Sequence, residues 1–296
     1  MLSLHTNVAS LSAQAALGST SKALSASLSA LSTGYRVNSA MDDAAGLQIA
    51  TRLDAQTRGM AVAQRNTQNG ISMMQTAEGS FNEVTSILQR MKDLATQGAD
   101  ATSTLTDRNA MQAEFDSLGK EMGNIMKNTS FGGAQLFSDG TVTTGAAGLL
   151  GATATLTFQI GASAGETMVV DTKTQLGLTA TDLTAAAGTY ATPATPGTEF
   201  ATNASANAII TKLSTALDSV GTMRSVLGAA SNRLDHVYNN LANMSQNTTA
   251  AKGRIMDVDY ASETAKMSTK QMLMQAGTSM LKQSNSMNQL ALSLMQ

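Results

Sequence analysis

The chain has 296 residues, of which 42% are hydrophobic but only 3% aromatic, with two prolines and neither cysteine nor tryptophan. A net charge of −2 offers no basic field for nucleic acid, and the lack of cysteine excludes disulfides, thiolate metal sites and cysteine nucleophiles. A core made of aliphatic side chains and methionine favours helix-on-helix packing, so we expect a mainly α-helical protein. No Lys or Arg precedes Lys22, and no compact apolar segment opens the chain, so we expect no cleavable secretory signal.

The opening segment predicts an amphipathic helix with a coiled-coil-like seam. Its leucines recur at spacings of seven with a three–four step, and we expect one break near Gly18 and an end at Gly34. The leucines are Leu4, Leu11, Leu17, Leu24, Leu28 and Leu31.

Two further helices are predicted before residue 130. Ser39 and Asp42 have the three-residue spacing of a capping box, which predicts a helix start there and a helix that runs to about Gly98. The same helix-start chemistry explains the acidic pair at 42–43 better than a metal or acid–base site does. The next helix is predicted to open at Thr106 and Asp107.

The middle of the chain has a different composition. The stretch "TLTFQIGASAGETMVVD" alternates apolar and polar residues on both sides of Gly161–Gly165, which predicts a β-hairpin with a five-residue loop. Residues 172–203 hold both prolines and are predicted to be surface loop. Helical periodicity resumes at Ala208, with a break expected near 250–253 before a final helix over 257–294.

The two ends of the chain mirror each other. Residues 1–21 and 283–296 carry no charged side chain, and each end repeats apolar residues every seven positions. The repeat at the second end comprises Leu273, Met280, Met287 and Leu294, with Leu290 beside it. Helices of this composition are marginal alone in water, so we expect them to pack on each other and on copies from neighbouring molecules. Such a non-closing contact generates a filament, although an ordinary intramolecular bundle fits the periodicity too.

No catalytic constellation is evident in the sequence. The two histidines, His5 and His236, fall in different predicted helices, and no nucleotide-binding, hydrolase or metalloprotease motif occurs. The methionines could suggest soft-metal binding, but without Cys or nearby His they fit adaptable packing better. We therefore expect no enzyme activity, no cofactor and no metal.

Several long motifs resemble the bacterial flagellin family. They are "ALSTGYRVNSAMDDAAGLQIATRL" at 30–53, "GISMMQTAEGSFNEVTSILQRMKDLATQ" at 70–97, "QAEFDSLGKEMGNIMKNTSFGGAQLF" at 112–137 and "GRIMDVDYASETAKMSTKQMLMQAGTSMLKQSNSMNQLALSLM" near the end. The chain departs from the family pattern at Met41, where a polar residue is more usual, and at "FGGAQL", where Phe-Asn-Gly is more usual.

The resemblance implies an extracellular filament subunit in three parts. Residues 1–40 and 254–296 would form an inner filament core of paired terminal helices, and residues 41–140 and 204–253 an outer helical core. Residues 141–203 would form the β-hairpin and a short variable surface region. Two rival interpretations remain: a hook–filament junction protein, and a secreted monomeric helical adhesin or effector.

The resemblance also implies partners. Family members are exported unfolded through the flagellar type III apparatus, escorted by a chaperone that holds the C-terminal region, and added beneath a cap protein on a hook-junction base. Neither nucleic acid nor membrane is expected as a partner.

The stretch "LQRMKDLATQ" at 88–97 resembles the flagellin segment that Toll-like receptor 5 recognises. The residues implied are Gln89, Arg90, Leu94, Gln97 and, on the neighbouring helix, Glu114. Helical spacing predicts a buried stripe of Val84, Leu88, Met91 and Ala95, with Leu94 at its boundary and Arg90 and Gln97 projecting away. Without the resemblance, a solvated helix face is the better interpretation.

Overall fold

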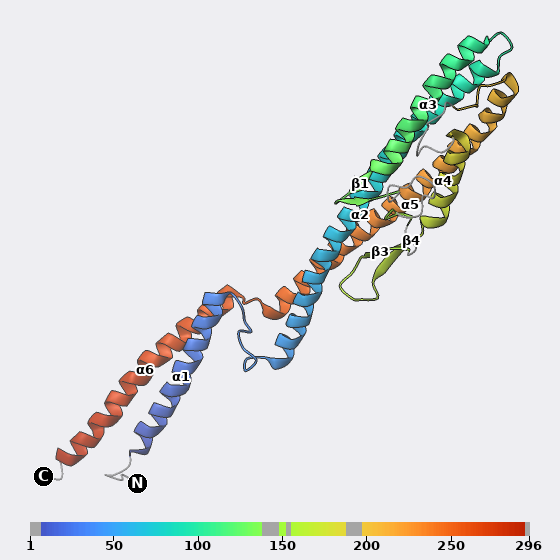
Figure 1. Ribbon diagram of the computed structural model, residues 1–296. Coiled ribbons are helices and arrows are strands. Elements are labelled where there is room, and N and C mark those ends of the chain that lie inside the picture. Colours follow the sequence, from blue (N-terminus) through green and yellow to red (C-terminus); the bar gives the residue numbers. More distant parts are fainter. Residues whose placement is uncertain (1–6, 138–147, 152–154, 188–196, 294–296) are drawn as a thin grey trace. The chain divides into compact units, whose positions relative to one another are not determined.

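The computed structural model describes residues 7–137, 148–151, 155–187 and 197–293, with side chains up to residue 286. Within these ranges the chain divides into two compact units, which comprise residues 1–57 with 246–296 and residues 58–245. The helices are α1 (Val8–Thr33), α2 (Ala44–Ala99), α3 (Leu105–Asn128), α4 (Lys173–Ala187), α5 (Asn203–Met256) and α6 (Tyr260–Ser293). The strands are β1 (Ser130–Phe131), β2 (Ala134–Gln135), β3 (Leu156–Gln159) and β4 (Thr167–Val170) (Figure 1). The predicted mainly α-helical class is confirmed.

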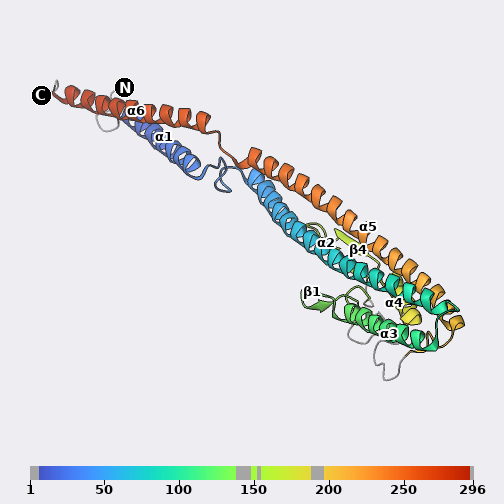
Figure 2. The same cartoon turned by 90° about the horizontal axis from the view of Figure 1, so that it is seen from above.

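In the first unit, α1 and α6 lie side by side along their lengths, as both views show (Figures 1 and 2). The expected break in α1 near Gly18 is wrong, because the helix is continuous from Val8 to Thr33. A single glycine costs a helix only about 1 kcal/mol relative to alanine, which the remaining turns absorb. Gly34 ends the helix as predicted: its φ of 76° is left-handed, and its N–H donates to the carbonyl of Ala30 at 2.9 Å.

The start of α2 differs in detail from the predicted capping box. The Asp42 carboxylate accepts from the backbone N–H groups of Asn38 and Ser39, which closes a turn ahead of the helix rather than its first turn. These hydrogen bonds, with that from Ser39 the largest, hold the pKa of Asp42 below its usual value. Asp43 does the capping, since its carboxylate accepts from the Gly46 N–H at 2.8 Å.

The break between the last two helices lies further along than predicted. Helix α5 passes through 250–253 uninterrupted and ends at Met256. There the Arg36 N–H donates to the Met256 carbonyl and the Val258 N–H donates to the Gly34 carbonyl, which ties the connector after α1 to the connector before α6. The intrahelical hydrogen bonds stop at 257–259 because the Met256 carbonyl and the Val258 N–H bond the segment after α1 instead.

The second unit contains the main hydrophobic core, which α2, α3, α4 and α5 share. Two aromatic pairs mark its centre: the rings of Phe81 and Phe137 lie 4.7 Å apart, and those of Phe115 and Phe200 meet edge to face at 5.1 Å. The predicted buried stripe of α2 is confirmed, since Val84, Leu88, Met91 and Ala95 are all fully buried.

Helix α4 contradicts the predicted surface loop over 172–203 within the described residues. Its buried residues, Leu176, Thr179, Leu183 and Ala186, fall three to four positions apart and form one face. The Asp182 carboxylate accepts from the hydroxyl of Ser219 on α5, which adds a polar contact to this packing. The stretch has few charges and small side chains, so its helical period is weak in the sequence.

Both hairpins are short. The predicted one is confirmed: β3 pairs antiparallel with β4, and the Ile160 N–H bonds the Glu166 carbonyl at 3.0 Å, leaving a five-residue loop. The hairpin of β1 and β2 was not predicted. It turns through Gly132 and Gly133, whose φ angles of 59° and 85° are those a two-residue type I′ turn needs.

Helix α3 begins at Leu105, one residue before the predicted start. Thr104 caps it, and Asp107 completes a capping box by accepting from the Thr104 N–H. The hydrogen bond from the Thr104 hydroxyl is the largest cause that lowers the pKa of Asp107. The N-cap residue of the box therefore lies two residues ahead of the predicted opening at Thr106.

Candidate assembly surface

The contact between α1 and α6 is built mainly from small and polar side chains. Ala30 and Leu24 are buried in it, and Ser27 is only 1% exposed. Leu17 lies against Gly277, where an added Cβ would stand 3.1 Å from the leucine Cγ and Cδ2. The two helices can approach closely because glycine, alanine and serine occupy the shared face.

A part-buried polar network around the buried hydroxyl of Ser27 fixes the register of this helix pair. The Ser27 hydroxyl donates to Glu263 Oε1 at 2.6 Å and accepts from Lys270 Nζ at 2.7 Å, while Lys266 Nζ donates to Glu263 Oε2 at 3.2 Å. The hydrogen bond from Ser27 is the largest cause that lowers the pKa of Glu263, and the two lysines lower it further. A slip of either helix would leave a buried hydroxyl and a carboxylate without partners.

The same register is held at the other end of the pair. The Asn7 side-chain amide donates to the backbone carbonyl of Ser284 at 3.3 Å and to its hydroxyl at 3.2 Å. The Ser10 hydroxyl donates to the Asn285 side-chain carbonyl at 3.1 Å. Ser27 meets Glu263 and Asn7 meets Ser284, so the two helices run antiparallel.

Several large apolar side chains of the pair are exposed instead of packed between the two helices. Six of them are between 48% and 68% exposed: Val8, Leu11 and Leu28 on α1, and Met272, Leu273 and Met280 on α6. By contrast, the buried hydrophobic residues of this unit are Leu24, Ala30, Val37 and Ala50 within the described residues. Exposure of this many large apolar side chains on one helix pair is typical of a protein–protein contact. We call these six residues the outward face.

The predicted assembly residues divide between the two faces. Leu24 is buried between the helices, Leu17 and Leu31 are half-buried, and Leu11, Leu28, Leu273 and Met280 belong to the outward face. The remaining ones, Leu4, Met287, Leu290 and Leu294, lie outside the residues whose side chains are described. A seven-residue repeat drifts by about 20° per heptad around a straight helix, so one repeat cannot stay on one face.

Sequence reasoning missed three features of this surface. Val8 and Met272 extend the outward face beyond the predicted residues. Met272 could have been found in the sequence, because it is adjacent to the predicted residue Leu273. The polar network of Ser27 with Glu263 and Lys270 has no signal in a single sequence, because it joins residues more than 230 positions apart.

Comparison with known proteins identifies the family. Residues 4–142 match the family described as "Bacterial flagellin N-terminal helical region", and residues 210–295 match "Bacterial flagellin C-terminal helical region". Flagellin A of Vibrio anguillarum is 35% identical over 390 aligned positions that cover 100% of both chains. The chain belongs to the bacterial flagellin family. Polar flagellin F of Vibrio parahaemolyticus is 32% identical and covers 99% of both chains.

Two solved structures are similar to this chain. The crystal structure of Bacillus cereus flagellin is 30% identical and covers 64% of this flagellin and 94% of its own chain, with a TM-score of 0.47. A structure described as a flagellar hook-associated protein from Vibrio parahaemolyticus covers 73% of this flagellin and 100% of its own chain, with a TM-score of 0.57 at 19% identity. The latter likeness concerns the fold alone.

Family membership confirms the expected identity, class and location. This flagellin is a structural subunit of the extracellular flagellar filament, and flagellins assemble into a homopolymer. The hook-junction interpretation is not favoured, because the full-length relatives are named flagellins. None of the described helices is long and apolar enough to cross a membrane.

The residues predicted for receptor recognition lie on α2 and α3. Arg90 pairs with Glu114 across the two helices, with Nη2 2.7 Å and Nε 2.8 Å from Oε1, and both side chains are about half exposed. Gln89 and Gln97 are exposed on α2. Leu94 is only 2% exposed, so its predicted boundary position is wrong and it packs within the core.

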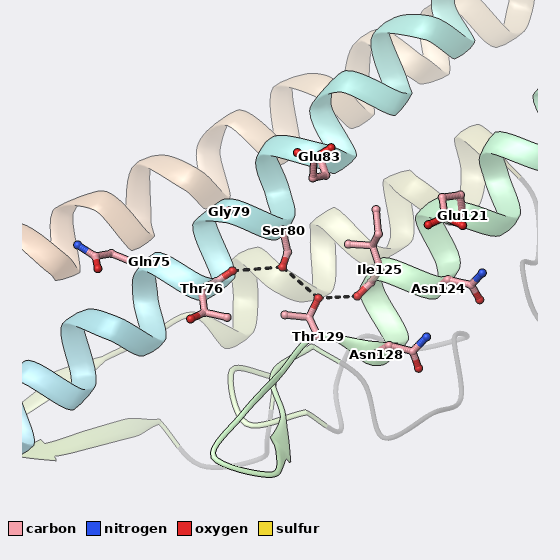
Figure 3. Close-up of a pocket in the computed structure, with 10 residues that line it drawn as sticks. All are labelled: Gln75, Thr76, Gly79, Ser80, Glu83, Glu121, Asn124, Ile125, Asn128 and Thr129. Atoms are coloured by element: carbon pink, nitrogen blue, oxygen red, sulfur yellow. Dashed lines mark hydrogen bonds between the residues drawn. The ribbon is translucent and has the colours of Figure 1, made fainter.

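A groove of about 550 Å³ lies between α2 and α3 (Figure 3). The hydroxyls of Ser80 and Thr129 lie 3.0 Å apart in it, and each is also within hydrogen-bond distance of a carbonyl of its own helix. Glu83 and Glu121 border the groove, and its lining residues include no Lys, Arg or His beside the hydroxyls that could act as a general base. Throughout the described part of the chain, no three His, Cys, Asp or Glu side chains gather as a metal site would require.

Proposed function

We propose that the outward face of α1 and α6 is the surface through which neighbouring subunits bind in the filament core. The supporting observation is that this unit buries few of its described hydrophobic residues but exposes six large apolar side chains on two helices. Burying a leucine or methionine of this size contributes about 1.5–3 kcal/mol. A repeated contact of this kind between copies, related by a non-closing operation, extends a filament without limit.

The assembly residues named above retain this proposed role, including the four without described side chains. We propose accordingly that residues 1–40 and 254–296 form the inner core, residues 41–140 and 204–253 the outer core, and residues 141–203 the hairpin and variable surface region. The support is that the outward face lies on α1 and α6, whereas the aliphatic core lies in the other unit.

Seeded elongation tests this surface. Filament seeds are mixed with purified subunit carrying Leu273→Gln, and growth is followed by light scattering and electron microscopy. The matched control is Leu178→Gln on α4, because Leu178 is 54% exposed and Leu273 is 56% exposed. We expect Leu273→Gln to slow elongation by roughly tenfold or more and Leu178→Gln to leave it unchanged. Equal rates for the two variants would contradict the assignment.

We propose further that the monomer is recognised by Toll-like receptor 5 through Gln89, Arg90, Gln97 and Glu114. The supporting observation is the Arg90–Glu114 ion pair, which brings predicted residues from α2 and α3 onto one exposed surface. Leu94 has an indirect role in this proposal: it is buried, so it positions α2 rather than offering a contact.

A reporter-cell assay with purified monomer tests receptor recognition. Arg90→Ala should weaken signalling by roughly tenfold, while Arg233→Ala, an exposed arginine on α5, should not. Leu94→Ala is unsuitable as the primary variant because it opens a core cavity. Signalling by Arg90→Ala equal to that of Arg233→Ala would exclude this surface.

Family membership also supports a proposed route to the filament. We propose export in the unfolded state through the flagellar type III apparatus, escort by a chaperone that binds the C-terminal region, and addition beneath the cap on a hook-junction base. The exposed apolar side chains of α6 are surface that a chaperone would shield before assembly. Co-purification of the subunit with the chaperone, lost when residues 260–296 are deleted, is the expected result.

A further inference from the structure

Methionine is the residue on which oxidants would act in this chain. It has 19 methionines but no cysteine and no tryptophan, so the usual competing targets are missing. The described methionines differ widely in exposure: Met74, Met91, Met122 and Met223 are fully buried, whereas Met272 and Met280 are 63% and 66% exposed. Oxidation by a small peroxide follows access to the sulfur, so Met272 and Met280 are expected to react before the buried methionines.

These two methionines are also part of the outward face. They lie eight positions apart on α6, about two turns, with Leu273 beside the first. No charged residue lies between them on the helix, since the nearest are Lys270 and Lys282. The thioether is apolar and adapts to a packed contact, whereas a sulfoxide places a strong hydrogen-bond acceptor in the same position.

We propose that Met272 and Met280 form an oxidation-sensitive modification site that controls whether a free subunit can be added to the filament. The proposal rests on the assignment of the outward face as the subunit contact. A thioether sulfur attacks one oxygen of hydrogen peroxide, the O–O bond breaks, and an S–O bond forms. The proton on the attached oxygen passes to the departing hydroxide, which leaves as water. Sulfur is oxidised by two electrons, and the peroxide is reduced.

The consequence follows from burial of the product. In a free subunit water solvates the sulfoxide, but in an apolar contact its oxygen has no donor and loses that solvation. Addition of an oxidised subunit is therefore disfavoured, whereas methionines already buried in a filament are protected from peroxide. The reaction reverses when a thiol-dependent methionine sulfoxide reductase returns the sulfur to the thioether.

The experiment treats wild-type subunit and the Met272→Leu/Met280→Leu variant with hydrogen peroxide and then adds each to filament seeds. Leucine keeps the size and apolarity of both positions but cannot be oxidised. Both proteins acquire sulfoxide at other exposed sites such as Met41 and Met244, so their difference isolates the two positions. We expect peroxide to slow elongation by wild type roughly tenfold and by the variant less than twofold.

Each result has one interpretation. If treated wild type elongates as fast as untreated, or if the treated variant slows as much as wild type, the oxidation site is wrong. If untreated wild type does not elongate seeds, or if Leu273→Gln elongates them normally, the outward face is not the subunit contact, and the underlying assignment rather than the oxidation site is contradicted. Peptide mapping provides a second measurement: Met272 and Met280 should gain oxygen faster than Met74 and Met91 in the subunit, and reductase should restore elongation. Equal rates at all four would overturn the proposal.

Discussion

At the scale of single residues, the connector after α1 depends on a glycine. Gly34 has a left-handed φ of 76°, and a Cβ there would stand 2.8 Å from the Tyr260 hydroxyl oxygen. Its carbonyl also accepts from the Val258 N–H at 3.0 Å. One residue therefore ends α1, leaves room for the first side chain of α6 and joins the two connectors.

Gly34→Ala should destabilise the α1–α6 pair by about 1–2 kcal/mol, because alanine is strained at positive φ and crowds Tyr260. Gly18→Ala is the matched control: Gly18 lies inside α1 with no atom within 4 Å of an added Cβ, so this change should stabilise by up to about 1 kcal/mol. Thermal disassembly of filaments, followed by circular dichroism, should move in opposite directions for the two. A shift in the same direction would contradict this account.

Glu263 adds a pH dependence to the same helix pair. Its pKa is lowered in the folded state, chiefly by the Ser27 hydroxyl, so the stability it contributes is present above its unfolded pKa and is lost as pH falls through its folded pKa. Glu263→Gln should destabilise filaments at pH 7 by roughly 1 kcal/mol, and this difference should shrink below about pH 4. The thermal disassembly midpoints of wild-type and Glu263→Gln filaments, compared between pH 7 and pH 3, measure this difference in stability. A difference that stays constant across that pH range would show that ionisation of the Glu263 carboxyl does not stabilise the helix pair.

At the scale of elements, helix ends and turns depend on a few residues with specific backbone roles. The capping box at Thr104, the cap at Asp43 and the turn at Gly132 and Gly133 each match a known local motif. Some of the departures from prediction also occurred at helix ends. The Ser39–Asp42 pair closes a turn rather than caps a helix, since one spacing serves either motif.

The β1–β2 turn makes a prediction about its first glycine. Gly132 has a φ of 59° and nothing within 4 Å of an added Cβ, so its conformation rather than space limits substitution. Gly132→Asn should be neutral or slightly stabilising, since asparagine tolerates the left-handed region and restricts the unfolded chain. Gly132→Val should cost about 1 kcal/mol or more, because a β-branched residue is strongly disfavoured there. Urea denaturation of the two variants provides the comparison, and equal midpoints would contradict it.

At the scale of the whole molecule, the two units differ in how much they bury. The aliphatic and aromatic core lies within 58–245, whereas the other unit buries few apolar side chains and exposes the outward face. A unit with few buried contacts unfolds locally at low free energy. We therefore expect the paired ends to be mostly disordered in a free subunit and ordered only when neighbours cover them.

Limited trypsin digestion checks this expectation. In the free subunit Lys22, Lys266 and Lys270 should be cut before Lys120 or Lys127 on α3, and the surviving fragment should contain 58–245. This order of cleavage should disappear in assembled filaments, where Lys22, Lys266 and Lys270 become protected. Early cleavage within α3 of the free subunit would contradict it.

Four features could be predicted without the structure: the family, the helical class, the β3–β4 hairpin and the buried stripe of α2. These depend on local periodicity and on long motifs, both of which a single chain displays. The tertiary structure alone decided that α4 is a helix, that Leu94 is buried and that Arg90 pairs with Glu114. It also decided which apolar residues of α1 and α6 face each other and which face outward. The physical reason is that a helix projects side chains in all directions around its axis, and only the position of a neighbouring element determines which of them are buried. Ser27, Glu263 and Lys270 illustrate it: each is an ordinary polar residue in the sequence, and their shared network exists only because the two helices meet.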